Sequence, residues 1–198
     1  MPESKLRDVS EAIEAWAGVD RSGWSPAARS AEFIQMLEIR ERFEATVLQA
    51  AGEWDREKCW VDDDALSPVS WILHRAPMTR TDASVLVRTA RHIAQHEATA
   101  KALGAGDISV SHATIIARAV RHRESLYPEH EDTILDAARQ VAPTPFRDVM
   151  RYWASCADDQ LDRGGARDFD GNYFDAARTF GGVGHAECRF DPLSLPRC

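Results

Sequence analysis

The sequence predicts an all-α protein, a multi-helix bundle of about seven or eight helices followed by a short C-terminal β-hairpin. Apolar residues recur at three- and four-residue steps through most of the first 165 residues, which is the period of helices with one buried face. After residue 165 this period gives way to two short segments around a glycine-rich turn, a pattern typical of a hairpin. We therefore expect a helical domain over residues 1–165 and a hairpin with a terminal tail over residues 166–198.

The first helices are predicted from the residues at their ends. Residues 4–17 are amphipathic and are followed by Gly18, a plausible stop. Ser25 is a good N-cap, and the proline after it suits the first position of a helix, so a long helix should run from Pro26 to about Asp55.

A cluster of three aspartates, residues 62–64, precedes a short predicted helix that passes through Trp71 to His74. Acidic side chains stabilise the start of a helix, and no partner ligand for a metal is evident nearby. We therefore expect the cluster to cap this helix or to be solvated.

The clearest amphipathic helix is predicted from Thr79 to His96, with small and branched apolar residues on one face and arginines on another. A short helix then ends at Leu103, before a Gly-Ala-Gly turn. Either Ser109 or Ser111 can cap the helix that follows.

The end of the helical domain is predicted from prolines. Pro128 opens a helix to about Val141, and Thr144 is expected to cap a final helix after the Pro-Thr-Pro break. The expected strands, Tyr173–Phe180 and His185–Phe190, flank the glycine-rich turn.

The composition is that of a soluble globular protein, with 44% hydrophobic and 28% charged residues. No apolar run approaches the roughly 20 residues that span a membrane, and the N-terminus has no apolar secretory core. We therefore expect a cytoplasmic protein without a membrane partner. The four cysteines (Cys59, Cys156, Cys188 and Cys198) form no closely spaced pair, so free thiols are expected and no cofactor or metal is.

Positive charge gathers in the middle of this acidic chain. The net charge is −8, yet residues 75–123 hold eight basic residues against three acidic ones, a local charge of +5. Arginines on an exposed helix face can follow a phosphate backbone, and a helix, a tight turn and a second helix meet here, as in many DNA-reading proteins. The alternative is a solvated polar face, which all-α proteins also have. The candidate nucleic-acid-binding residues are Arg80, Arg88, Arg91, Arg118, Arg121 and Arg123.

Motifs of catalytic sites are absent from the sequence. His92 and His96 have the spacing of two zinc ligands in a protease helix, but Ile93 stands where the catalytic glutamate is required, so we expect two surface histidines. The sequence holds no nucleophile elbow and no phosphate-binding glycine loop. We therefore expect a chain that is not an enzyme.

Several segments resemble an actinobacterial family, the domain of unknown function 222 or 13E12 repeat family. They are W-V-D-D-D-A-L-S-P-V-S-W-I-L from Trp60, A-R-H-I-A from Ala90, the sixteen residues from Ala102 to Ala117, and R-T-F-G-G-V-G from Arg178. Their order and spacing carry the resemblance, which covers most of residues 25–192. In addition, G-D-I-S-V-S-H-A from Gly106 is similar to a segment near the DNA-reading helices of partition proteins.

Members of this family usually continue into an HNH nuclease domain, and some are associated with mobile elements. The resemblance therefore implies a DNA-related setting, but the histidines and asparagine of such a domain are missing here. We expect a non-catalytic accessory domain of an HNH-nuclease-associated protein, with DNA as the expected partner of the arginines. The alternatives are an interaction or oligomerisation module that uses the helix over residues 26–55, or a truncated fragment without independent function.

Overall fold

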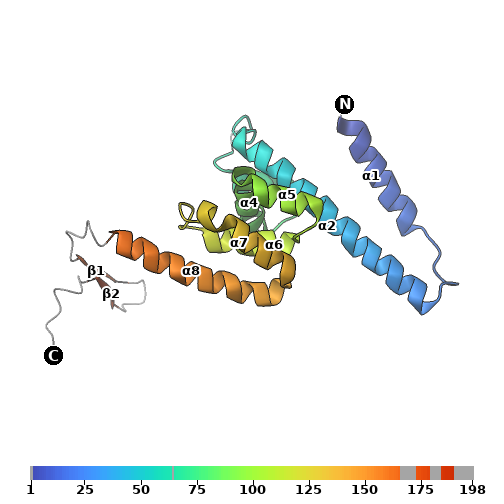
Figure 1. Cartoon of the computed structure of the whole chain (residues 1–198). Helices are drawn as coiled ribbons and strands as arrows, with labels where there is room; N and C mark the ends of the chain where they lie inside the picture. The colour runs from blue at the N-terminus through green and yellow to red at the C-terminus, as the bar shows by residue number, and fades with distance from the viewer. Residues whose placement is uncertain (1, 64, 166–172, 179–183, 190–198) are drawn as a thin grey trace.

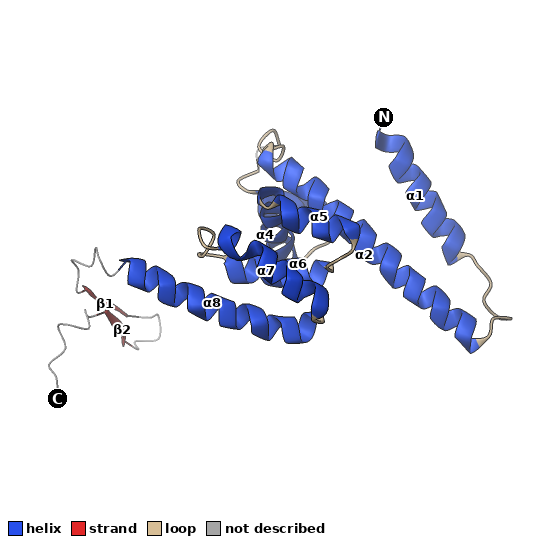
Figure 2. Ribbon diagram, viewed as in Figure 1, coloured by secondary structure: helices blue, strands red, loops and turns tan. Residues whose placement is uncertain are grey.

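The computed structural model describes residues 2–63, 65–165, 173–178 and 184–189, and this part of the chain holds eight helices (Figures 1 and 2). The helices are α1 (Pro2–Ala17), α2 (Pro26–Arg56), α3 (Pro68–Arg75), α4 (Arg80–Gln95), α5 (Glu97–Ala105), α6 (Val110–Val120), α7 (Tyr127–Gln140) and α8 (Pro143–Gly165). The predicted all-α class is confirmed.

Two short strands follow the helices, β1 (Tyr173–Arg178) and β2 (Gly184–Arg189). They pair antiparallel, with Tyr173 opposite Arg189. The predicted turn between them and the terminal tail fall on residues 179–183 and 190–198, which lie outside the described residues. The hairpin as a unit, and the domain boundary at residue 165, stay predictions.

Side-chain caps fix where four of the eight described helices begin, namely α2, α3, α4 and α6. The hydroxyl of Ser25 accepts from the amide of Ala28 (3.2 Å) at the start of α2, as predicted. At α6 the cap is Ser109, and the His112 ring accepts a hydrogen bond from the Ser109 amide to complete a capping box. Of the two serines left open by the sequence, Ser109 is therefore the cap.

One predicted helix start was wrong, that of α8, and of the two roles left open for the aspartates capping is not observed. Helix α3 begins at Pro68, capped by the hydroxyl of Ser67, so the aspartates at 62 and 63 lie before the helix and do not cap it; Asp64 lies outside the described residues. Asp63 instead accepts from the indole of Trp71 (2.5 Å). Helix α8 begins at Pro143, one residue before Thr144, because proline needs no amide partner in a first turn.

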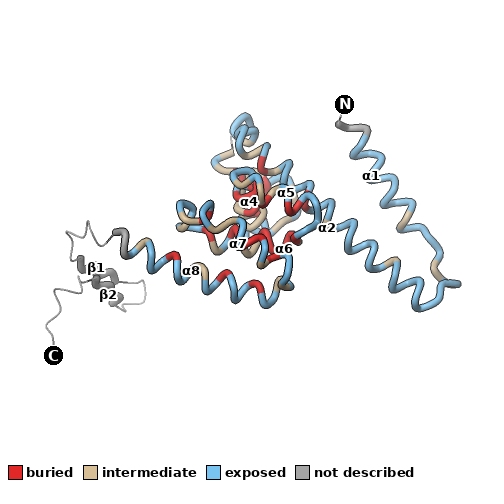
Figure 3. Tube along the Cα trace, in the orientation of Figure 1, coloured by how far each residue is buried: buried red, intermediate tan, exposed pale blue. Residues whose placement is uncertain are grey.

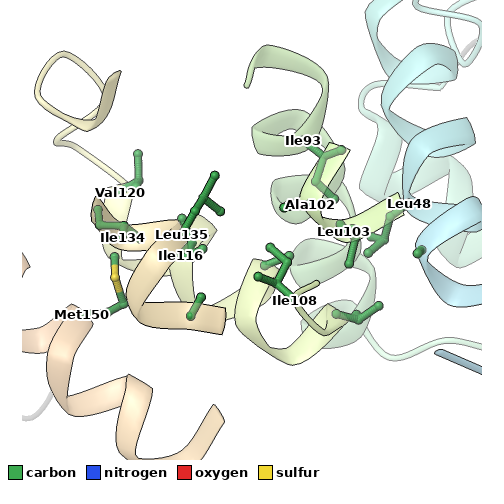
Figure 4. Packing of buried hydrophobic residues seen from close by; sticks show 14 of the residues in the cluster. Leu48, Ile93, Ala102, Leu103, Ile108, Ile116, Val120, Ile134, Leu135 and Met150 are labelled. Carbon is green, nitrogen blue, oxygen red and sulfur yellow. The ribbon is translucent and has the colours of Figure 1, made fainter. Parts of the chain in front are cut away.

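Helix α4 lies at the centre of the fold, in contact with α2, α3, α5 and α6. Its apolar face is fully buried at Ala83 and Ala90, and it joins side chains of the other helices in the main core (Figure 4). The largest fully buried side chains of that core are Tyr127, Phe146 and Ile116. Because the apolar face of α4 is packed against other helices, the helix cannot rotate, and its polar face keeps a fixed position at the surface.

The crossing of α2 over α4 is unusually close at Gly52. A Cβ atom at this position would lie 2.8 Å from the carbonyl oxygen of Ala90 and 3.1 Å from the Cβ of Ala94. A smaller apolar cluster around Ile72 and Val87, with the paired rings of Trp54 and Trp71 beside it, joins α3 to the same crossing. Glycine is therefore required here for backbone approach, and it sets the distance between α2 and α4.

The N-terminal part of the chain is built differently from the rest. Helix α1 and the first half of α2 extend away from the packed helices, and their surfaces are almost entirely exposed (Figures 1 and 3). Buried residues of α2 begin only at Ala45. In the described residues no helix has the length and apolar character needed to cross a membrane.

Candidate nucleic-acid interface

The arginines of α4 lie on the side of the helix that faces away from most of its buried residues. Arg80 and Arg88 are two turns apart with Ser84 between them, and Arg91 continues the row one turn later. Thr79 fixes the start of this row, since its hydroxyl accepts from the amide of Asp82 (3.1 Å). The predicted arginine stripe is thus an outward face of the best-anchored helix in the fold.

The end of α6 brings a second group of basic residues to the same place. Arg118 is in the last turn of α6, and the chain then turns through His122, whose φ of +68° is in the left-handed region. A histidine in that region is uncommon and costs of order 1 kcal/mol. This turn sets Arg121, His122 and Arg123 in one short loop beside α4.

These residues line one surface hollow between α4 and α6. Its volume is about 670 Å³, and five of the six predicted arginines border it, from α4, α6 and the loop after α6; they are Arg80, Arg88, Arg118, Arg121 and Arg123. Residues up to 43 positions apart in sequence are therefore brought together, as the DNA-binding prediction requires.

Two further hollows adjoin the first. One, of about 540 Å³, shares Arg88 and Arg121 with it and continues along α4 past Arg91 to Gln95. The other, of about 420 Å³, lies between α6 and α8 and shares Arg118. We call the three adjoining hollows the arginine groove.

Arg88 has the most confined position in the groove. Its guanidinium is partly buried, and its Nε has no hydrogen-bond partner among the described residues. Burial lowers its pKa, and the nearby positive charges of Arg121 and Arg118 lower it further. No ion pair joins these three arginines to a carboxylate in the described part of the chain. Three converging guanidiniums without a counter-charge favour binding of an anion.

Two of the six candidate arginines, Arg91 and Arg123, form ion pairs with aspartates. Arg91 makes two hydrogen bonds to Asp55 of α2, at 2.5 Å and 3.2 Å, and these raise its pKa. Arg123 makes two to Asp158 of α8, at 2.6 Å and 2.5 Å, and another to the carbonyl of Ala119 (2.9 Å). Arg91 therefore joins α4 to α2, Arg123 joins the loop after α6 to α8, and each has a carboxylate as its counter-charge.

Helix α8 contributes two basic residues that the sequence analysis did not include. Arg147 and Arg151, one turn apart, line the hollow that contains Arg118. Arg151 also pairs with Asp148 (2.8 Å) on an exposed part of α8. Their four-residue spacing is a visible signal in the sequence, but only the packing of α8 against α6 places them at the groove.

Acidic residues are sparse in the groove. Among the described residues that line the three hollows, Glu124 is the one acidic residue. It borders only the 540 Å³ hollow. It accepts from the amide of His122 (3.0 Å) and so supports the left-handed turn. The middle of the groove, around Arg88, Arg118 and Arg121, thus keeps its positive charge.

His92 of α4 is buried and His96, the residue after this helix, is half-buried, so the prediction of two surface histidines was wrong. His92 is 6% exposed, and His96 is half-buried, with the two rings 4.5 Å apart and both packed edge-on against Tyr127. Burial, and to a lesser extent the nearby His96, lower the pKa of His92 to about 3, so the ring is neutral at physiological pH.

Metal chemistry gains no support from this histidine pair. Among the described residues no group of three or more histidine, cysteine, aspartate or glutamate side chains could hold a metal ion. Cys59 and Cys156 are free and exposed, as expected of these two thiols.

Comparison with known proteins gives no relative. No family model, no curated protein and no solved structure matches this chain. The resemblance to the domain of unknown function 222 therefore stays a prediction, and functional inference depends on the geometry of the arginine groove.

Proposed function

We propose that this chain is a non-catalytic DNA-binding domain that holds the phosphate backbone in the arginine groove. The observation that carries the proposal is the convergence of Arg88, Arg118 and Arg121, from α4, α6 and the following loop, without a carboxylate paired to any of them. A like-charged cluster is costly to assemble, and an anion in the groove removes that cost.

The shape of the groove favours an extended polyanion over a single phosphate ion. Its positive groups are spread over three adjoining hollows, from Arg80 at the start of α4 to Arg151 on α8. Successive phosphates of a nucleic acid strand could each meet a different arginine, whereas one ion would leave most of them unpaired. Such contacts hold the backbone and give no sequence preference.

The wider setting follows from the resemblance described above. An accessory domain of an HNH-nuclease-associated protein needs to hold DNA while the chemistry occurs elsewhere. A groove of arginines on a rigid helical core supports that role. The net charge of −8 restricts binding to this one face, because the rest of the surface repels DNA.

The test is a fluorescence anisotropy titration with labelled duplex and single-stranded DNA at several salt concentrations. Each arginine that neutralises one phosphate adds about −0.9 to the slope of log K against log salt for duplex DNA. We expect Arg88→Glu with Arg121→Glu to weaken binding strongly and to reduce the slope by roughly 2. Circular dichroism should show unchanged helical content.

A matched control carries the same charge change away from the groove. Arg7→Glu with Arg42→Glu alters two exposed arginines on α1 and α2 and should leave the affinity and its salt slope close to wild type. Absence of DNA binding by the wild type at low salt would overturn the proposal. Equal weakening in the two double variants would do the same, since it would assign binding to net charge and not to the groove.

A further inference from the structure

The exposed half of α2 carries a regular apolar stripe. Phe33, Met36, Phe43 and Val47 are 59%, 40%, 47% and 37% exposed, although large apolar side chains usually avoid water. With Arg40 between them, their positions follow alternating steps of three and four residues. This is the seam of a helix that packs lengthwise on another helix. The buried residues of α2, Ala45 and Leu48, lie on a different face.

A second exposed apolar stripe lies on α1. Leu6, Val9, Ile13 and Trp16 follow the same three- and four-residue steps, and the first three are 64%, 39% and 60% exposed. The indole of Trp16 donates to the carboxylate of Glu32 on α2 (2.7 Å), so this face of α1 is turned towards α2. Beyond that contact the two helices diverge (Figure 1), and both stripes remain uncovered.

The two stripes together are large for a surface without a partner. If a fully exposed large side chain presents roughly 200 Å², the residues named above and Leu37 present on the order of 750 Å². The largest apolar patch of a typical monomer is about 300–600 Å². A stable interface buries about 800 Å² on each partner, which is close to the area available here.

The charges within the stripe indicate which molecule covers it. Arg40 lies in the middle of the α2 seam, and Glu44 is one turn further; neither has an ion pair among the described residues. A parallel pair of α2 helices would set Arg40 against its own copy. An antiparallel pair that places Met36 against Val47 sets Arg40 across from Phe43 and beside Glu44 of the other copy. Symmetry then forms this ion pair twice.

We propose that the chain forms a two-fold symmetric homodimer through the apolar stripe of α2, packed antiparallel, with α1 of each copy covering the sides of a four-helix bundle. Each copy supplies the same surface, which is the usual arrangement of a two-fold interface. The arginine groove lies on α4, α6 and α8 and takes no part in this contact. The proposal is therefore independent of DNA binding.

The first test is the mass of the full chain, measured by sedimentation equilibrium over a range of protein concentrations. The wild type should be a dimer, and Phe43→Glu should raise its dissociation constant about tenfold or more, as expected for an anchor residue of an interface. Leu66→Glu is the matched control, because this leucine is 93% exposed outside α1 and α2 and should have no effect on mass. Unchanged circular dichroism would show that both variants fold.

The second test addresses the antiparallel arrangement. Arg40→Glu should weaken the dimer, and the double change Arg40→Glu with Glu44→Arg should restore it, because the swap rebuilds the same two ion pairs. A monomeric wild type at every soluble concentration would overturn the proposal, whether another protein or α1 itself covers the stripe. A dimer that tolerates Phe43→Glu, or that the charge swap does not restore, would overturn the proposed interface.

Discussion

The close crossing of α2 and α4 makes a strong prediction for Gly52→Ala. In an isolated helix this change would be favourable by about 1 kcal/mol, since alanine is the better helix former. Here the new Cβ would lie 2.8 Å from the carbonyl oxygen of Ala90, a backbone atom that cannot rotate away. Overpacking of this kind costs typically about 1–3 kcal/mol. We expect the free energy of unfolding to fall by up to about 2 kcal/mol after the helix term of about 1 kcal/mol is subtracted.

Gly104→Ala is the matched control within a helix. Its Cβ would meet only the side-chain amide nitrogen of Gln49 at 3.3 Å, and that side chain can move. This variant should be as stable as wild type or more stable, by up to about 1 kcal/mol. Urea unfolding followed by circular dichroism measures both variants. If Gly52→Ala were as stable as Gly104→Ala, the two helices could not approach each other as closely as the structure shows.

Two further predictions concern polar side chains, the buried ring of His92 and the serine that caps α6. The pKa of His92 is about 3 in the folded state against about 6.5 when unfolded, so only the unfolded chain binds its proton as the pH falls below 6.5. Stability should therefore be full above pH 6.5 and fall towards pH 5, with a slope that His92→Gln reduces by up to about 1.4 kcal/mol per pH unit; an unchanged slope would contradict the burial of this ring. Ser109→Ala should cost about 1 kcal/mol through loss of the α6 cap, whereas Ser111→Ala, on an exposed side chain, should be neutral in the same urea assay; equal losses would contradict the assignment of the cap.

The helices were predictable because their signals are local. The three- and four-residue period and the caps at Ser25 and Thr79 depend only on neighbouring residues. At α3 the sequence left the role of the aspartates open, and at α8 the predicted start was one residue late. Ser67 and the aspartates before it are both suitable caps by type, and the choice depends on how the loop reaches the partly buried Trp54–Trp71 pair.

The groove was predictable only in part, because it is made by long-range packing. The arginines of α4 share a face by spacing alone, and the sequence shows this. Which of them remains free depends on carboxylates far away in the chain: Asp55 reaches Arg91, 36 residues on, and Asp158 reaches Arg123. The same holds for His92, whose ring is buried by Tyr127 from α7. No pattern of neighbouring residues predicts these long-range contacts.

The two halves of α2 also differ in what keeps them helical. A free helix of about 15 residues is marginally stable in water, since ordering its first turn costs more conformational entropy than the first hydrogen bond recovers. Residues from Ala45 onward are ordered by the core, so they serve as a permanent first turn from which the exposed half can extend. In a monomeric variant such as Phe43→Glu, the amide protons of residues 26–40 should then exchange with solvent through fraying from Pro26, while those near Gly52 should exchange only on global unfolding. Helix α2 would then show two amide exchange rates. The residue at which the rate changes would mark the point where packing against the core ends.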